Sequence, residues 1–377
     1  MEKEFNPFLV SGYKGMEYFC DRENETARLK SHIKNNLNTT LFAIRRLGKT
    51  GLINHVFENY KNSRQVACIY VDILGTANLK EFTDQLATAV YNRFPEDRSI
   101  GKKIYDFIKQ LRPVISYDEL SGLPELSIEA GETKKPERTI QQLFSFLDKQ
   151  NIKVVFAIDE FQQILKYPEK NTEAILRTYI QTLHNTNFIF CGSNQRMMHE
   201  IFNSAKRPFY ASCSNMHLGF IEENIYRSFI NKLFKKNKRK IDTESVSFIL
   251  EWTLCHTFYT QFFCNHLFNT NLKTISISDV HSAATEILKR NENTYYQYRN
   301  LLTTAQWNLL RAVAKETKLF RAHSKAFIKK YDLDTSSMIT RGLEALQEKE
   351  LVFYNTAVEK PYYEVYDKFL MRWLQHT

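Results

Sequence analysis

The sequence predicts an α/β protein: a core built on a parallel sheet, followed by an all-helical region and a C-terminal winged helix-turn-helix. Three observations lead to this fold class. Short apolar segments alternate with helical patterns over the first part of the 377-residue chain. Helical periodicity alone takes over from about Glu222. Three helix candidates followed by two strand-like segments then close the sequence.

The predicted sheet has five strands. Each candidate is a continuous apolar segment and not an alternation of apolar and polar residues, which is the pattern of a strand covered on both faces. Helical stretches separate the segments, so we expect parallel strands with helices on both sides of the sheet. The segments are residues 39–44, 66–73, 154–160, 187–193 and 216–221.

The rest of the chain divides by composition and periodicity. Residues 111–137 combine prolines and glycines with β-branched fragments, and we expect a hairpin or loop excursion from the main sheet. We predict a core domain over residues 1–221, a helical lid domain over residues 222–302 and a winged-helix domain over residues 303–377.

The most informative motif is AIRRLGKT, residues 43–50, between the first strand and an apolar helix. A phosphate-binding loop needs backbone N–H groups around the phosphates, a lysine for the β and γ oxygens and a hydroxyl for Mg²⁺. Gly48, Lys49 and Thr50 meet these needs. Ala43 replaces the first glycine of the GxxxxGK[ST] pattern, which is acceptable only at negative φ. An inactive scaffold that lost function through Ala43 is therefore one alternative.

Two carboxylates end the third predicted strand. Asp159 and Glu160 follow the buried segment VVFAI, where charge is costly without a cation or water to hold. We expect Asp159 to hold the Mg²⁺ shell and Glu160 to orient and deprotonate an attacking water. The alternative is an ordinary acidic turn after a core strand.

Further polar residues follow the fourth strand. Gly192, Ser193 and Asn194 leave the sheet at the same carboxyl edge as Asp159, where ligands bind in parallel sheets. Ser193 or Asn194 is the candidate sensor of the γ-phosphate or its water. Arg207, before the fifth strand, is the candidate arginine finger in cis or in trans, with a surface ion pair as its alternative.

Together these segments resemble the prokaryotic archaeal-type ATPase family, within the AAA+/STAND group of P-loop NTPases. The resemblance rests on AIRRLGKTGL, VVFAIDEFQQILKYPE, FIFCGSNQRMMHEIF, AKRPFY and HTFYTQFFCNHLF, and it extends over nearly the whole chain. It implies a P-loop αβα core, a helical lid, a winged helix, and ATP with Mg²⁺ as cofactors. Its phosphate-binding segment corresponds to Arg45, Arg46, Leu47, Gly48, Lys49, Thr50 and Gly51, its metal ligands to Thr50 and Asp159, its Walker B carboxylates to Asp159 and Glu160, and its sensor to Ser193 or Asn194.

The start of the matching region departs from the family pattern. Cys20, Asp21, Arg22 and Glu23 stand where many relatives have Gly-Arg-Glu. In the family this position lies on the adenine side of the nucleotide. We therefore expect the departure to leave the phosphate-binding loop unaffected.

Bulk composition limits the partners and the compartment. Fifty-two Lys and Arg against 42 Asp and Glu give a net charge of +10, which permits an acidic partner such as nucleic acid or a phosphorylated ligand. Six scattered cysteines show no metal-binding spacing and fit a reducing cytoplasm. The N-terminus lacks the pattern of a signal peptide, and no segment has the length and apolar character of a membrane span.

The predicted recognition helix of the winged helix, residues 334–350, is only weakly basic. Its exposed face would carry Thr335, Ser336, Thr340 and Arg341, and the wing adds only Lys360. A strong reader of DNA usually has more positive charge at these places. DNA binding therefore stays open beside protein docking or autoinhibition.

The functional hypothesis is a slow MgATPase that couples its nucleotide state, through the lid and the winged helix, to a partner or to assembly into a homo-oligomer. The motifs around Lys49 and Asp159 carry this hypothesis. The alternative is a nucleotide-gated DNA-binding regulator with little or no turnover.

Overall fold

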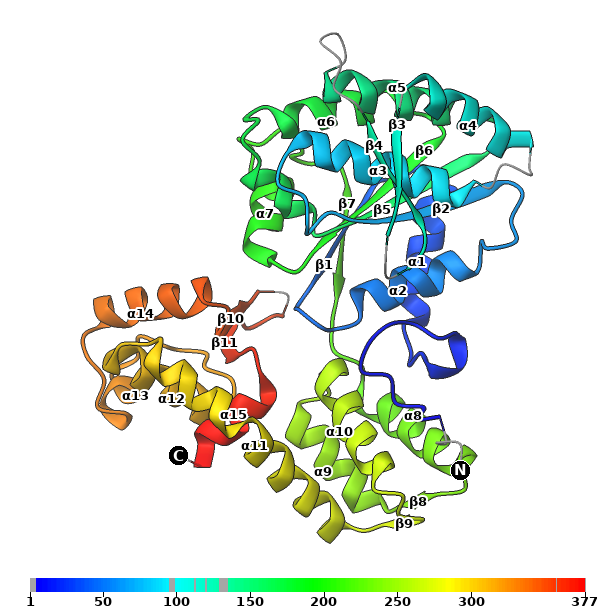
Figure 1. Ribbon diagram of the computed structural model, residues 1–377. Helices are drawn as coiled ribbons and strands as arrows, with labels where there is room; N and C mark the ends of the chain where they lie inside the picture. Colours follow the sequence, from blue (N-terminus) through cyan, green and yellow to red (C-terminus); the bar gives the residue numbers. More distant parts are fainter. Residues whose placement is uncertain are drawn as a thin grey trace. The chain divides into compact units, whose positions relative to one another are not determined.

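The computed structural model describes residues 5–94, 99–111, 113–118, 121–128, 135–356 and 358–376 (Figure 1). The described chain forms two compact units: residues 22–218, here called the sheet unit, and the described residues of 1–21 and 219–377, here called the helical unit. The N-terminal residues thus belong with the helical unit. That residues 222–302 and 303–377 act as separate domains stays a prediction.

The sheet unit is built on the five predicted strands. They pair in the order β2-β5-β6-β1-β7, and every neighbouring pair is parallel. The order places β6 between β1 and β5, so the carboxyl ends of these strands meet at one edge. The strands are β1 (Thr39–Ala43), β2 (Val66–Asp72), β5 (Lys153–Asp159), β6 (Thr186–Gly192) and β7 (Ser214–Leu218).

Helices connect these strands and cover the sheet (Figure 1). In α5 the buried residues Ile140, Leu143, Phe144 and Leu147 recur at helical spacing and form one apolar face. Stacked rings of Phe156, Phe188 and Phe190 continue this core across β5 and β6. The helices are α1 (Glu23–Lys34), α2 (Lys49–Glu58), α3 (Leu79–Arg93), α4 (Ser99–Gln110), α5 (Pro136–Asp148), α6 (Thr172–Ile180) and α7 (Gln195–Asn203), with a 3₁₀ segment η2 (Phe161–Lys166).

The predicted excursion is a hairpin. Strands β3 (Pro113–Tyr117) and β4 (Pro124–Ile128) pair antiparallel and form a separate two-stranded sheet. The hairpin is joined to α3, because the Ile128 N–H donates to Asp84 and the Leu126 N–H donates to the hydroxyl of Thr88.

After residue 219 the helical unit has four helices, and two of them, α8 and α10, contact Phe8 of the N-terminal residues. The ring of Phe8 lies 4.8 Å from that of Phe234 and 6.2 Å from that of Phe268. The helices are α8 (Glu223–Lys236), α9 (Thr243–Thr253), α10 (Thr257–Asn269) and α11 (Ile277–Asn300), with a short 3₁₀ segment η1 (Met16–Tyr18) and the two-residue parallel strands β8 (Lys240–Ile241) and β9 (Thr274–Ile275).

The last part of this unit has the predicted winged helix-turn-helix. It contains α12 (Thr304–Glu316), α13 (Lys325–Lys330), α14 (Ser336–Glu348), the antiparallel strands β10 (Val352–Asn355) and β11 (Tyr362–Val365), and α15 (Lys368–His376). Helix α15 is tied to α9, because Arg372 donates to the carbonyls of Trp252 at 2.9 Å and Glu251 at 2.7 Å. The winged helix and the four preceding helices therefore pack together.

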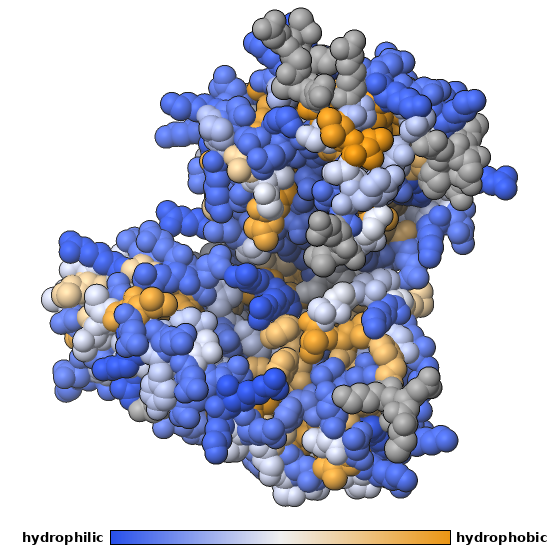
Figure 2. Space-filling view, viewed as in Figure 1, coloured by the Kyte–Doolittle hydropathy of each residue, from blue (hydrophilic) through white to orange (hydrophobic). Residues whose placement is uncertain are grey.

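The face drawn in Figure 2 is mainly polar. Hydrophilic residues cover most of the face drawn in Figure 2, and apolar residues occupy smaller areas of it. Across the described ranges, we find no helix with both the length and the apolar character that crossing a bilayer requires.

Candidate functional site

The loop between β1 and α2 has the backbone that a phosphate-binding loop needs. Gly48 precedes α2 in the left-handed region at φ 97°, and Arg46 has φ 63°. Ala43 is the last residue of β1 and is not among the residues with positive φ. The condition for alanine at this position is thus met. The N–H groups at the start of α2 remain available for an anion.

Arg22, the residue directly before α1, supports this loop, a role that the sequence did not indicate. Its side chain is only 4% exposed, and it donates to the carbonyl of Leu47 at 3.4 Å and pairs with Glu25 at 3.0 Å. The sequence signal was the entry motif itself, which we expected to affect only the adenine side. Arg45 and Arg46, in contrast, are exposed in the loop, and Gly51 lies in the first turn of α2.

The acidic end of β5 lies against this loop. Asp159 is 4% exposed and accepts hydrogen bonds from the Lys49 ammonium at 3.0 Å and the Thr50 hydroxyl at 2.9 Å. The Lys49 ammonium also lies 3.6 Å from a carboxylate oxygen of Glu160. The fold thus brings the four principal candidate residues together at one edge of the sheet.

Tyr70 is a further member of this cluster that sequence reasoning missed. Its hydroxyl donates to Asp159 at 2.8 Å from the neighbouring strand β2. Strands β2 and β5 pair in parallel register, with Tyr70 opposite Ala157 and Asp72 opposite Asp159. A tyrosine inside an apolar strand segment gives no sequence signal for this contact.

Of the two sensor candidates, Ser193 contacts the acidic pair. Its N–H and its hydroxyl both donate to Glu160, at 3.2 Å and 2.8 Å. Asn194 instead caps α7, because its side-chain oxygen accepts from the Met197 N–H at 3.1 Å. Ser193 therefore contacts Glu160 while Asn194 caps α7, and the sensor role stays a prediction.

Arg207 lies in ion pairs outside this cluster. Its guanidinium pairs with Glu200 at 3.0 Å and with Glu173 at 3.5 Å. These contacts correspond to the ion-pair alternative that we considered from the sequence. A role as an arginine finger, in cis or in trans, stays a prediction.

Burial and opposite charge together set the protonation of Asp159 and Lys49. Burial alone would raise the pKa of Asp159, but the Lys49 charge and hydrogen bonds from Lys49, Tyr70 and Thr50 hold that pKa below its ordinary value. Burial alone would lower the pKa of Lys49, but its neighbouring carboxylates raise that pKa above its ordinary value. The site therefore keeps a buried carboxylate and an ammonium charged together.

This charge state predicts an acid-sensitive contribution to stability. A carboxyl with a lowered folded pKa stabilises the fold above its unfolded pKa, and this contribution is lost as the pH falls through the folded pKa. Tyr70→Phe removes one hydrogen bond that lowers the pKa of Asp159. We expect a loss of about 1.5–3 kcal/mol at neutral pH. We also expect acid unfolding, followed by circular dichroism, to begin at a higher pH.

Tyr117→Phe is the matched control, because Tyr117 is exposed on β3. It should leave the acid unfolding curve in place. An unchanged curve for Tyr70→Phe would show that the hydroxyl does not stabilise the Asp159 charge.

The oxygen atoms at this edge fit a hard cation. The Thr50 hydroxyl and the Asp159 carboxylate lie 2.9 Å apart, and Mg²⁺ in proteins is commonly held by one or two such groups together with phosphate oxygens. Within the described residues, no three or more His, Cys, Asp or Glu side chains form a group that could hold a metal. Phosphate oxygens of a nucleotide and water molecules would supply the remaining ligands.

The parallel order of the sheet, the loop before α2 and the acidic pair define a P-loop nucleotide-binding protein with a C-terminal winged helix. The model of ATPase domains predominantly from Archaea matches residues 19–255, and the model of a probable winged helix domain matches residues 293–376. The chain belongs to this archaeal-type ATPase family. No curated protein matches the chain.

Solved structures show the same fold over the whole chain. The Walker-type ATPase of Pyrococcus abyssi matches with a TM-score of 0.68 and 15% identity over 98% of this chain and 99% of that one. The ORC2 protein of Aeropyrum pernix, in ADPNP-ADP complexes, matches with a TM-score of 0.58 and 12% identity over 99% and 97%. The ORC1 protein of Aeropyrum pernix, in complex with DNA, matches with a TM-score of 0.50 and 13% identity over 95% and 93%.

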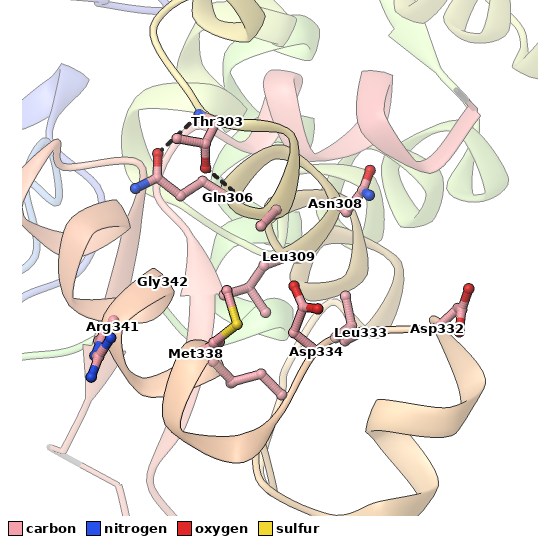
Figure 3. A pocket seen from close by; sticks show the side chains of 12 residues that line it. Thr303, Gln306, Asn308, Leu309, Asp332, Leu333, Asp334, Met338, Arg341 and Gly342 are labelled. Atoms are coloured by element: carbon pink, nitrogen blue, oxygen red, sulfur yellow. Dashed lines mark hydrogen bonds between the residues drawn. The ribbon is translucent and has the colours of Figure 1, made fainter.

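Apart from this site, the winged helix has a pocket of about 180 Å³ between α12 and α14 (Figure 3). Leu309, Leu333 and Met338 give it apolar walls, and Asp332 and Asp334 add two exposed carboxylates. A Cβ atom at Gly342 would lie 2.7 Å from the Leu309 side chain, so the glycine allows α14 to approach α12 closely.

Proposed function

We propose that the chain binds MgATP at the Lys49, Thr50, Asp159 and Glu160 cluster and hydrolyses it slowly to ADP and phosphate. The observation that carries this proposal is the position of the Lys49 ammonium, 3.0 Å from Asp159 and 3.6 Å from Glu160. A lysine, a hydroxyl and two carboxylates are the groups that phosphoryl transfer in P-loop enzymes uses.

Each residue has a separate task in this proposal. Lys49 binds the β and γ oxygens, and the loop N–H groups at Gly48 hold the phosphates. Thr50 and Asp159 would hold Mg²⁺, which when bound neutralises charge on the phosphate oxygens. Glu160 accepts a proton from the attacking water, and Ser193 fixes its carboxylate.

Slow turnover is expected because the candidate arginine finger is occupied elsewhere. Arg207 is paired with Glu200 and Glu173, and an arginine finger contributes about 10³–10⁵-fold to the rate in related chemistry. A second copy of the chain or a partner would then have to supply that charge. This supports a role as a switch more than as a fast motor.

The proposal is tested by the release of phosphate from ATP by the purified chain. We expect slow release that requires Mg²⁺ and stops when the metal is chelated. An absence of release together with an absence of any thermal shift with MgATP would contradict the proposal and favour an inactive scaffold.

We further propose that the nucleotide state is passed on through the helical unit. Arg372 ties the winged helix to α9, so a displacement of the lid helices carries the winged helix with it. The particle mass should therefore be measured with and without a non-hydrolysable ATP analogue. A mass that rises with nucleotide supports assembly into a homo-oligomer, while an unchanged mass would leave a monomeric switch.

For the partner of the winged helix, we favour a protein over DNA. The pocket beside α14 carries Asp332 and Asp334 in exposed positions, and these carboxylates repel a phosphate backbone. Its apolar walls, with Met338 48% exposed, suit a side chain of a protein partner. The net charge of +10 and the ORC1 structure solved with DNA support the second candidate, a nucleotide-gated DNA-binding regulator.

These two candidates differ in their response to salt. We expect little salt-dependent duplex binding by the full-length chain, and no effect of Arg341→Glu on it, measured by fluorescence anisotropy. Point substitution is preferable to deletion of residues 303–377, because α15 packs on α9. Strong duplex binding that falls with salt and with Arg341→Glu would instead establish the DNA-binding regulator.

A compartment can be proposed on chemical grounds. All six cysteines are free thiols, and four of them are buried. Free buried thiols are typical of a reducing compartment. We therefore propose a cytoplasmic location.

A further inference from the structure

The two carboxylate oxygens of Glu160 have different surroundings. Oε2 accepts three hydrogen bonds: from Gln162 Nε2 at 2.5 Å, from the Ser193 N–H at 3.2 Å and from the Ser193 hydroxyl at 2.8 Å. Oε1 lies 3.6 Å from the Lys49 ammonium. One oxygen is therefore held by short-range donors, and the other faces the phosphate-binding lysine.

Gln162 donates to Glu160 although its own carbonyl oxygen accepts no hydrogen bond in the part of the chain that the structure describes. It lies in η2 directly after the acidic pair and is 7% exposed. Its carbonyl oxygen is buried and has no hydrogen-bond partner within the described residues. The orientation of the amide follows from Glu160, because a carboxylate accepts hydrogen bonds and the NH₂ group must face it. An amide kept in place with its own carbonyl unpaired indicates that the contact with Glu160 decides its position.

Gly192 provides the space for this amide. A Cβ atom at Gly192 would lie 1.9 Å from the Gln162 carbonyl oxygen and 2.9 Å from the sulfur of Met198. Gly192 ends β6 and directly precedes Ser193, the other donor to Glu160. Gly192 at the end of β6 thus leaves room for the Gln162 amide, and Ser193 directly after it donates to Glu160 as well. Gln162 and Ser193 are together called the clamp of Glu160.

We propose that Gln162 is a positioning residue for ATP hydrolysis, which together with Ser193 holds Oε2 of Glu160 and leaves Oε1 to accept the proton of the attacking water. The inference rests on the proposed function. In the step, the water oxygen bonds to the γ-phosphorus while the bond from that phosphorus to the bridging oxygen of ADP breaks. The water proton passes to Oε1, and Lys49 leaves Oε1 for the phosphates.

The first test replaces the Gln162 amide with an apolar side chain of similar volume. Gln162→Met should lower kcat by about 10- to 100-fold, because a loosely held base is misplaced. The KM for ATP and the Kd of a non-hydrolysable ATP analogue should stay unchanged, since Gln162 contacts Glu160 and lies outside the phosphate-binding loop. Gln163→Met is the matched control, because Gln163 lies in the same segment but donates to the carbonyl of Thr76. Its kcat should equal that of the wild type.

The second test fills the space at Gly192 that the Gln162 amide occupies. Gly192→Ala should displace the Gln162 amide and lower kcat. The same change on top of Gln162→Ala should cost less than it does alone, because the nearer displaced group is gone and only the Met198 sulfur remains close. Such coupling would not arise from a general loss of packing at β6. Additive losses would contradict the clamp.

The outcomes separate this inference from the proposed function. A wild-type chain without ATP turnover would overturn both. Wild-type turnover with an unchanged kcat in Gln162→Met would overturn the positioning role alone. A raised KM with unchanged kcat would also overturn it, because it would assign Gln162 to binding.

Discussion

Lys49→Ala is expected to weaken the binding of MgATP to this chain strongly. The ammonium lies 3.0 Å from Asp159, at the start of α2 where phosphates would bind. Truncating one partner of a buried charge pair weakens binding by about 2–5 kcal/mol, or at least thirtyfold. Titration calorimetry with a non-hydrolysable ATP analogue measures this loss directly.

The same substitution removes the counter-charge of Asp159, so folding must be measured alongside. Loss of one member of a buried ion pair costs about 3–5 kcal/mol of unfolding free energy. Lys49→Arg keeps the charge and separates the two effects, because a guanidinium does not replace an ammonium between phosphates. Lys80→Ala is the control, since Lys80 forms a partly exposed pair with Asp84. Undiminished nucleotide binding by Lys49→Ala would contradict the assignment of the site.

Glu160→Gln is expected to stop turnover and to keep ATP bound. Removing a general base lowers the rate by about 10²–10⁴-fold. The amide keeps one carbonyl oxygen, which can accept the hydrogen bonds that Gln162 and Ser193 now donate to Oε2. The fold and the loop around Lys49 should therefore be preserved. Binding of radiolabelled ATP and steady-state release of phosphate are the two measurements.

Glu58→Gln is the matched control for this change, because Glu58 is exposed at the end of α2. It should turn over at the wild-type rate. Retained turnover in Glu160→Gln would mean that another group activates the water. Loss of ATP binding in Glu160→Gln would mean that Glu160 belongs to the binding surface.

The sequence predicted the sheet because burial on both faces leaves continuous apolar segments. All five segments became strands, with bounds shifted by one to three residues, since hydrogen bonding rather than apolar character ends a strand. The convergence of Lys49 and Asp159 was also predictable, because Lys49 belongs to a phosphate-binding motif and a buried carboxylate such as Asp159 is costly without a cation beside it.

The supporting contacts could not be predicted in the same way. Tyr70 reaches Asp159 only because β2 and β5 pair in register, and Gln162 reaches Glu160 only because Gly192 leaves space. Arg22 contacts the phosphate-binding loop across 25 residues of sequence. None of these side chains carries a periodic or spacing signal. These contacts form only because segments that are distant in the sequence pack together in the fold.

A crystal structure of the Glu160→Gln chain with ATP and Mn²⁺ would show where the triphosphate and the metal bind. We expect the Lys49 ammonium to leave Asp159 for the β and γ oxygens, and the anomalous signal of the metal to lie beside the Thr50 hydroxyl. A triphosphate bound away from the loop before α2, or a metal distant from Thr50 and Asp159, would contradict this expectation.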